Sequence, residues 1–199
     1  LVYNSTTHLW DTAAIGANPY YSRRKGRYFS TYTSIDKIGV NFPKNKIYAM
    51  PFIVPVNQTF DRIAVYESQN QAGGVAHIGI YKDNDDVYPD TLVLQTAELD
   101  CSVIGLKEAI IDQELKAGLY WLAINSNGDA NITIIGFNYL TTKPISYYGI
   151  LADDSAILSS YSGLFWRKDL VYAALPSTFP EGAEIRKSEN LPAIWLRKA

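Results

Sequence analysis

The chain has one cysteine, one methionine and two histidines among its 199 residues. Because Cys101 has no cysteine to pair with, an internal disulfide is impossible, which excludes a secreted domain held together by disulfides. We predict that Cys101 is a small buried hydrophobic residue. His8 and His77 lack the spacing of zinc ligands, either to each other or to Cys101. The sequence therefore predicts no metal site and no cofactor.

The chain also lacks a strong charge bias and a long apolar run. It carries 18 Lys and Arg against 20 Asp and Glu, a formal net charge of −2. This balance argues against nucleic acid as an electrostatic partner. No apolar run approaches the ~20 residues of a membrane-spanning helix, and no signal segment is evident. We therefore expect no nucleic-acid partner and no membrane insertion.

Catalytic motifs are missing as well. There is no Gly-x-Ser-x-Gly elbow and no glycine-rich phosphate loop ending in Lys-Ser or Lys-Thr. Carboxylates that cleave glycosidic bonds are paired in space rather than in sequence, so Glu108, Asp112, Asp153 and Asp154 are available for that role. Such residues are more typical of solvated loops and strand edges, and we expect that the protein is not an enzyme.

Apolar residues, by contrast, make up 47% of the chain, which also contains 15 Tyr and four Trp. This composition supports a large core and favours β-strands, because the tyrosine ring packs well on a pleated sheet. Residues 118–125 are apolar on both sides of an extended strand, so we place them in the centre of a sheet. Asn127-Gly128 tolerates positive φ and predicts a hairpin there.

Short apolar runs separated by polar turns continue along the chain. Pro51 and Pro55 predict that the strand over 47–56 lies at a sheet edge or bends at a bulge. A single helical turn is predicted over 153–158. The other predicted strands cover 38–42, 59–67, 75–82, 91–99, 105–112, 144–150 and 192–197.

This pattern predicts an all-β fold, a two-sheet antiparallel sandwich of jelly-roll type. We assign residues 35–199 to this domain and residues 1–34 to an extended N-terminal arm. A basic cluster in the arm is interpreted as exposed chain or as a dock on a neighbouring subunit or an acidic surface. The candidate docking residues are Tyr20, Tyr21, Arg23, Arg24 and Arg27.

Three loop regions are candidate sites. Asp83-x-Asp85 resembles the start of a calcium loop, but the later ligands are missing and an acidic hairpin loop is favoured. Aromatic rings beside charged side chains are typical of sugar sites, but also of subunit interfaces and cores. Two such patches are Tyr147 and Tyr148 with Asp153 and Asp154, and Tyr161 with Trp166 and Arg167.

Several short motifs, taken in order, resemble a β-sandwich module of virion proteins of tailed bacteriophages. The resemblance covers roughly residues 40–199. The motifs lie at 46–56, 59–65, 76–83, 88–94, 105–108, 117–123 and 191–197.

The resemblance implies a tail fibre, an adsorption appendage or a head-surface protein, often trimeric, with no catalytic residues to transfer. We therefore expect a structural protein of the virion surface, in the tail or on the head, that recognises host-surface glycan. Its expected partners are copies of itself in a homotrimer, other virion proteins and host polysaccharide. The alternatives are a capsid decoration, cement or head-fibre protein without a receptor role, and a surface-polysaccharide depolymerase.

Overall fold

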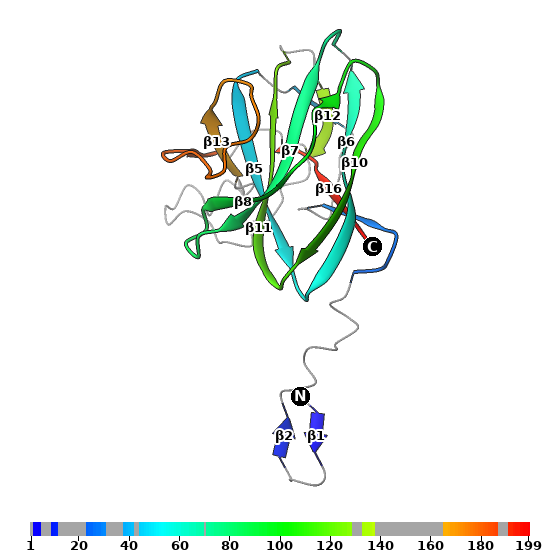
Figure 1. Cartoon of the computed structure of the whole chain (residues 1–199), viewed down its shortest axis with the longest axis vertical. Helices are drawn as coiled ribbons and strands as arrows, with labels where there is room; N and C mark the ends of the chain where they lie inside the picture. Colours follow the sequence, from blue (N-terminus) through cyan, green and yellow to red (C-terminus); the bar gives the residue numbers. More distant parts are fainter. Residues whose placement is uncertain are drawn as a thin grey trace, which may run out of the picture.

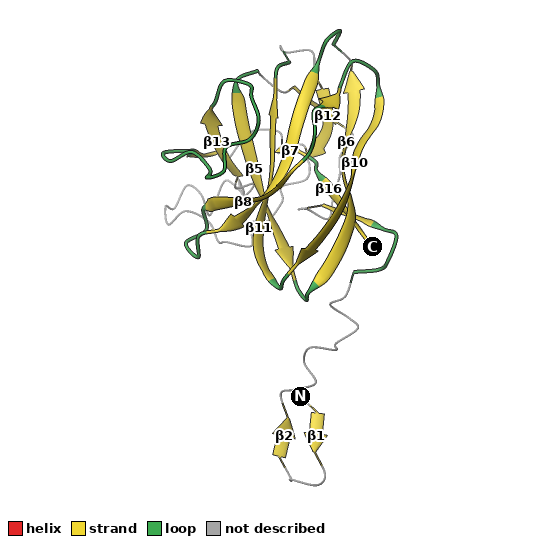
Figure 2. Ribbon diagram, viewed as in Figure 1, coloured by secondary structure: helices red, strands yellow, loops and turns green. Residues whose placement is uncertain are grey.

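The computed structural model describes residues 2–4, 9–11, 23–30, 38–41, 44–69, 71–128, 133–137, 165–186 and 191–199. Figure 2 shows strands and loops in these segments and no helix, so the described chain contains no helix that could cross a membrane. The predicted strand over 144–150 and the helical turn over 153–158 lie outside the described residues.

The strands form two seven-stranded antiparallel sheets (Figure 1). Sheet I contains β3 (Tyr28–Ser30), β4 (Ile38–Asn41), β6 (Gln58–Gln69), β10 (Gly105–Leu115), β12 (Thr133–Phe137), β15 (Leu191–Pro192) and β16 (Trp195–Lys198). Sheet II contains β5 (Lys46–Val54), β7 (Val75–Asp83), β8 (Pro89–Gln95), β9 (Leu99–Asp100), β11 (Gly118–Ser126), β13 (Phe165–Asp169) and β14 (Glu184–Arg186).

The chain crosses repeatedly between the sheets, from β5 to β6 to β7 and again from β10 to β11 to β12. The side chains facing inward from both sheets make one continuous core, which includes Phe52, Phe60 and Cys101. The predicted all-β, two-sheet antiparallel sandwich is confirmed. Two further strands, β1 (Val2–Asn4) and β2 (Leu9–Asp11), pair only with each other among the described strands.

Strand β11 lies in the middle of sheet II, as its apolar pattern predicts. It pairs with β5 on one side and β7 on the other, so that Leu122 lies opposite Met50 and Ile80. Leu122 faces the core between the sheets, whereas Trp121 and Ala123 point to the outer face of sheet II. Both sets are buried, because a second layer covers the outer face.

That second layer is the segment 170–183, which we call the strap. Leu175 and Phe179 of the strap pack on Tyr81 and Trp121, and all four side chains are buried. The Tyr81 hydroxyl donates to the carbonyl of Pro176 at 2.8 Å. The strap also bonds to the backbone of β8, for instance through the Phe179 N–H. The strap therefore covers the outer face of sheet II, which explains why the strands of this sheet are apolar on both faces.

The prediction of an edge or bulged strand at Pro51 is wrong for the first half of β5. Strand β13 pairs with β5 as far as Ala49, so residues 46–49 are interior. Beyond Ala49 only β11 pairs with β5 among the described strands, and Pro51 lies in that part. Pro51, which has no backbone N–H to donate, therefore lies where β5 has only one neighbouring strand among those described.

The predicted hairpin at Asn127-Gly128 is also wrong. Strand β12 belongs to sheet I and does not pair with β11, and neither residue has positive φ. Instead, Asn127 Oδ1 accepts from the Val75 N–H at 2.8 Å, and its Nδ2 donates to the Gly73 carbonyl at 3.0 Å. The asparagine amide thus anchors the neighbouring β6–β7 turn while the chain crosses to the other sheet.

Part of the predicted N-terminal arm lies in the sandwich. Strand β3 pairs with β16, with Tyr28 opposite Arg197, and the Gly26 N–H donates to the Lys198 carbonyl at 2.8 Å. Residues 23–30 therefore form the border of sheet I.

Candidate functional site

The predicted site residues fall into two groups. Those outside the described residues are Tyr20, Tyr21, Tyr147, Tyr148, Asp153, Asp154 and Tyr161. The structure describes Arg23, Arg24, Arg27, Trp166 and Arg167.

Trp166 and Arg167 are neighbours in β13 and point to opposite faces of sheet II, because successive side chains of a strand alternate. The Trp166 ring packs edge-on against Tyr88, with ring centroids 4.7 Å apart, and its Nε1–H donates to the Val87 carbonyl at 2.9 Å. Trp166 therefore fastens the β7–β8 turn to the strap side of the sheet. It does not share a contact patch with Arg167.

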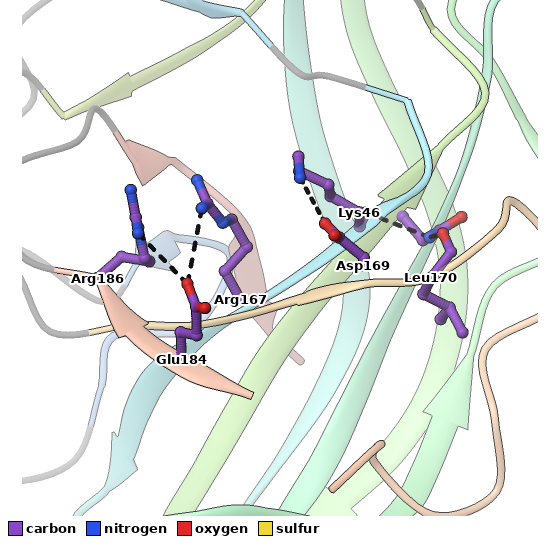
Figure 3. Close-up of polar contacts among 7 residues, drawn as sticks. Lys46, Arg167, Asp169, Leu170, Glu184 and Arg186 are labelled. Atoms are coloured by element: carbon purple, nitrogen blue, oxygen red, sulfur yellow. Dashed lines mark hydrogen bonds and ion pairs between the residues drawn. The ribbon is translucent and has the colours of Figure 1, made fainter. Parts of the chain in front are cut away.

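Arg167 lines a charged pocket at the border of sheet II, which we call the Arg167 pocket. Strand β13 lies between β5 and β14, so that Arg167 is opposite Glu184 and Lys46 is opposite Asp169. Figure 3 shows both carboxylates reaching across the strands to these cations. The cavity measures about 190 Å³, and its lining is completed by Lys168 and Gly182.

The cations of this pocket are recessed and the carboxylates are exposed. Lys46 and Arg167 expose 26% and 19% of their side chains, whereas Asp169 and Glu184 expose 82% and 69%. Arg186 on β14 adds a further cation, whose Nη1 lies 3.3 Å from Glu184 Oε2. The hydrogen bond and the charge of Lys46 lower the pKa of Asp169, which keeps this carboxylate ionised at neutral pH.

The backbone around the pocket is held by side-chain hydrogen bonds. The buried Asn125 amide donates to the carbonyls of Lys46 and Leu170, at 3.2 Å each, and so links β11, β5 and the start of the strap. Lys168 Nζ donates to the Gly182 carbonyl at 3.0 Å. Gly182 has a φ of 66°, a turn that favours glycine where the strap passes into β14. The backbone that carries the cations of the pocket is therefore held in place by these hydrogen bonds.

Arg23 contacts the core of the sandwich, and its predicted docking role stays a prediction. Its guanidinium lies 4.4 Å from the centroid of the buried Phe52 ring, and its Nη2 donates to the Ile53 carbonyl at 2.8 Å. Arg23 therefore packs on the core of the sandwich. Arg24 and Arg27 are exposed, and their docking role stays a prediction.

A second, larger pocket of about 310 Å³ lies beside the acidic β7–β8 turn, with Lys82, Asp85 and Lys116 in its lining. Asp83, also in the lining, accepts a 2.7 Å hydrogen bond from Trp121 Nε1. In the part of the chain that the structure describes, no three His, Cys, Asp or Glu side chains come together as a metal site would require.

Sheet I carries a polar network on its outer face that the sequence pattern did not reveal. The Tyr28 hydroxyl donates to Glu108 at 2.5 Å, and Arg62 lies 3.6 Å from the same carboxylate. Partial burial and this hydrogen bond raise the pKa of Tyr28 to about 12. Asp61 and Arg197 form a bidentate pair at 2.7 and 2.8 Å. Glu108 is therefore a partner in a surface network.

Sequence reasoning found Arg167 but missed Lys46, Asp169 and Glu184. Lys46 is 123 residues from Asp169 in the chain, and Glu184 lies on a different strand from Arg167, so the strand register is what brings each pair together. No protein-family model matches the chain, and the curated proteins include no significant match to it.

Proposed function

We propose that this chain is a structural β-sandwich module at the surface of a bacteriophage virion, in a tail fibre or adsorption appendage, and that it binds host-surface glycan. The motifs of the resemblance coincide with β5, β6, β7, β8, β10, β11 and β16, which are the scaffold strands. A rigid scaffold that presents a site at its border suits an appendage that must hold its shape while contacting a cell.

The observation that carries the receptor role is the Arg167 pocket. It is a small concave site with charged side chains from β5, β13 and β14, set on hydrogen-bonded backbone. Sugar hydroxyls and carboxylates are bound by such convergent polar groups. The proposal involves no reaction: the module would bind and display, without cleaving the polysaccharide.

Adsorption to cells tests the receptor role. The full chain, fluorescently labelled, is incubated with a panel of bacteria and with their isolated surface polysaccharide. We expect saturable binding to at least one strain and competition by polysaccharide from the same strain. An absence of binding to every cell and surface fraction would remove the receptor role.

A second candidate is an architectural protein, a capsid decoration or head-fibre component with no receptor role. It is favoured by the open outer face of sheet I, where Leu106 and Ile110 are 52% and 79% exposed. Leu106 also lies opposite Tyr66, which is 39% exposed, and neighbouring exposed apolar side chains are typical of contact surfaces. Under this proposal, removal of residues 1–22, which precede the described sandwich, abolishes attachment to particles and leaves the thermal unfolding midpoint unchanged. Retained attachment would contradict it.

The resemblance implies a homotrimer, and under the receptor proposal a trimer is also favoured because several weak sites gain avidity when they are joined. Light scattering of the purified full chain during size exclusion measures the mass directly. A trimer is expected, and a stable monomer at micromolar concentration would contradict this part of the proposal.

A further inference from the structure

The arrangement of charge in the Arg167 pocket suggests which sugars it takes. Lys46, Arg167 and Lys168 line it, and Arg186 lies beside it, against the two carboxylates of Asp169 and Glu184. Cations are therefore in excess. Lys46 and Arg167 are also recessed, whereas the carboxylates of Asp169 and Glu184 are exposed to solvent.

Glu184 marks where a ligand carboxylate would fit. Arg167 Nη2 and Arg186 Nη1 both approach its Oε2, at 3.9 and 3.3 Å (Figure 3). Arginine is the residue best suited to bind carboxylates, because its planar fork presents several donors. Two guanidinium groups thus already converge on one carboxylate oxygen.

The internal pair is weak enough to be replaced. Glu184 is 69% exposed and both contacts are long, and exposed ion pairs of this kind contribute little to stability. A ligand carboxylate that displaces Glu184 into solvent therefore gives up little. A neutral sugar has no group that could make the same exchange.

We propose that the Arg167 pocket binds the carboxylate of an acidic sugar unit, such as a uronic acid, with Arg167 and Arg186 exchanging Glu184 for the ligand. This inference rests on the proposed glycan-binding function and narrows it to acidic polysaccharides. The cavity of about 190 Å³ is below the roughly 300 Å³ at which pockets for drug-sized ligands begin, so it takes one sugar unit of a longer chain.

Calorimetry with the full chain tests the inference directly. The probes are a tetramer of galacturonic acid, the same tetramer with its carboxyls methyl-esterified, and a sulfated galactose tetramer. We expect binding of the free acid and loss of binding on esterification. Equal binding of the ester would overturn the inference. Stronger binding of the sulfated tetramer than of the uronate would overturn the assignment to a carboxylate.

Two substitutions have opposite expected effects. Glu184→Gln removes the competing carboxylate and should tighten uronate binding by up to about fivefold, the equivalent of an exposed ion pair. Arg167→Gln combined with Arg186→Gln should weaken it by at least about tenfold, because charge-assisted hydrogen bonds are lost. Unchanged affinity in both variants would overturn the inference.

Glu108→Gln is the matched control, since it makes the same change in an arginine-paired carboxylate on sheet I. We expect its uronate affinity to equal that of the unmodified chain. Thermal unfolding of each variant shows whether a loss of binding reflects a loss of folding. If cells adsorb the chain but uronate does not bind, only this inference fails. If no cell or surface fraction adsorbs it, the proposed function itself fails.

Discussion

The outer faces of the two sheets differ although both sheets belong to one sandwich. On sheet II the strap buries Tyr81 and Trp121 in a second core. On sheet I the outer face carries ion pairs and hydrogen bonds, such as Asp61 with Arg197, beside the exposed Ile110. A strand that will be covered on both sides is apolar on both, whereas a strand with one wet face alternates. The strand pattern therefore distinguishes the two sheets.

The largest expected effect is at the second core. Trp121→Ala should destabilise the protein by about 3–5 kcal/mol, because a fully buried aromatic side chain is replaced by a cavity. Chemical denaturation followed by tyrosine fluorescence measures the change in free energy of unfolding.

Ile110→Ala on the open face provides the contrast. Its side chain is 79% exposed, and a change of less than about 0.5 kcal/mol is expected. Similar losses at both positions would mean that the outer face of sheet I is buried in solution, for instance in an oligomer, and would remove the contrast between the sheets.

A smaller effect is expected where the strap touches β7. A Cβ at Gly79 would lie 2.5 Å from Leu175 Cδ1 and 2.7 Å from the Leu94 carbonyl oxygen. Gly79→Ala should therefore push the strap from the sheet at a cost of about 1–3 kcal/mol, as overpacking does. Hydrogen exchange should show faster exchange of strap amides, notably Phe179, than of β6 amides. Equal acceleration throughout the sandwich would show that the strap has no independent stability.

Sheet I also places a carboxylate in the interior, and this predicts a pH dependence. Glu67 is fully buried and accepts from the Thr133 N–H at 2.9 Å, and desolvation raises its pKa. Because the folded pKa is above the unfolded one, the contribution to stability is present below the unfolded pKa and is lost as the pH rises through the folded value. Denaturation measured from the unfolded to the folded pKa of Glu67 should show the free energy of unfolding declining as the pH rises. Glu67→Gln should reduce this dependence on pH. An unchanged slope in the variant would contradict this assignment.

A small effect is also expected at the ion pair on the open face. The hydrogen bond to Arg197 lowers the pKa of Asp61, so its contribution is present above the unfolded pKa and is lost as the pH falls through the folded one. Asp61→Asn should cost about 0–1 kcal/mol at neutral pH, less in high salt. Unfolding measured at two salt concentrations checks this. A loss as large as that of Trp121→Ala would mean that the pair is not solvated.

The local sequence pattern predicted the structure correctly where a strand is covered on both faces, because consecutive residues of such a strand are all apolar. Residues 118–125 are an example, since Trp121 and Leu122 are both apolar and both buried on opposite faces. It failed at Asn127-Gly128, because an asparagine that tolerates positive φ can equally bond to a distant turn. At Pro51 the prediction of an edge strand was partly right. The described part of β5 that contains Pro51 has one neighbouring strand, because β13 pairs with β5 only as far as Ala49.

The sequence by itself determined that short strands would form, which of them are apolar on both faces, and that their layers would make a β-sandwich, because side-chain alternation is a local property of an extended chain. Only the tertiary structure decided that residues 170–183 cover sheet II, and that Lys46 meets Asp169 while Arg167 meets Glu184. The contact of Lys46 with Asp169 depends on the register between β5 and β13, which lie far apart in the chain. That register is set by the packing of the whole core, to which each short segment contributes only a part.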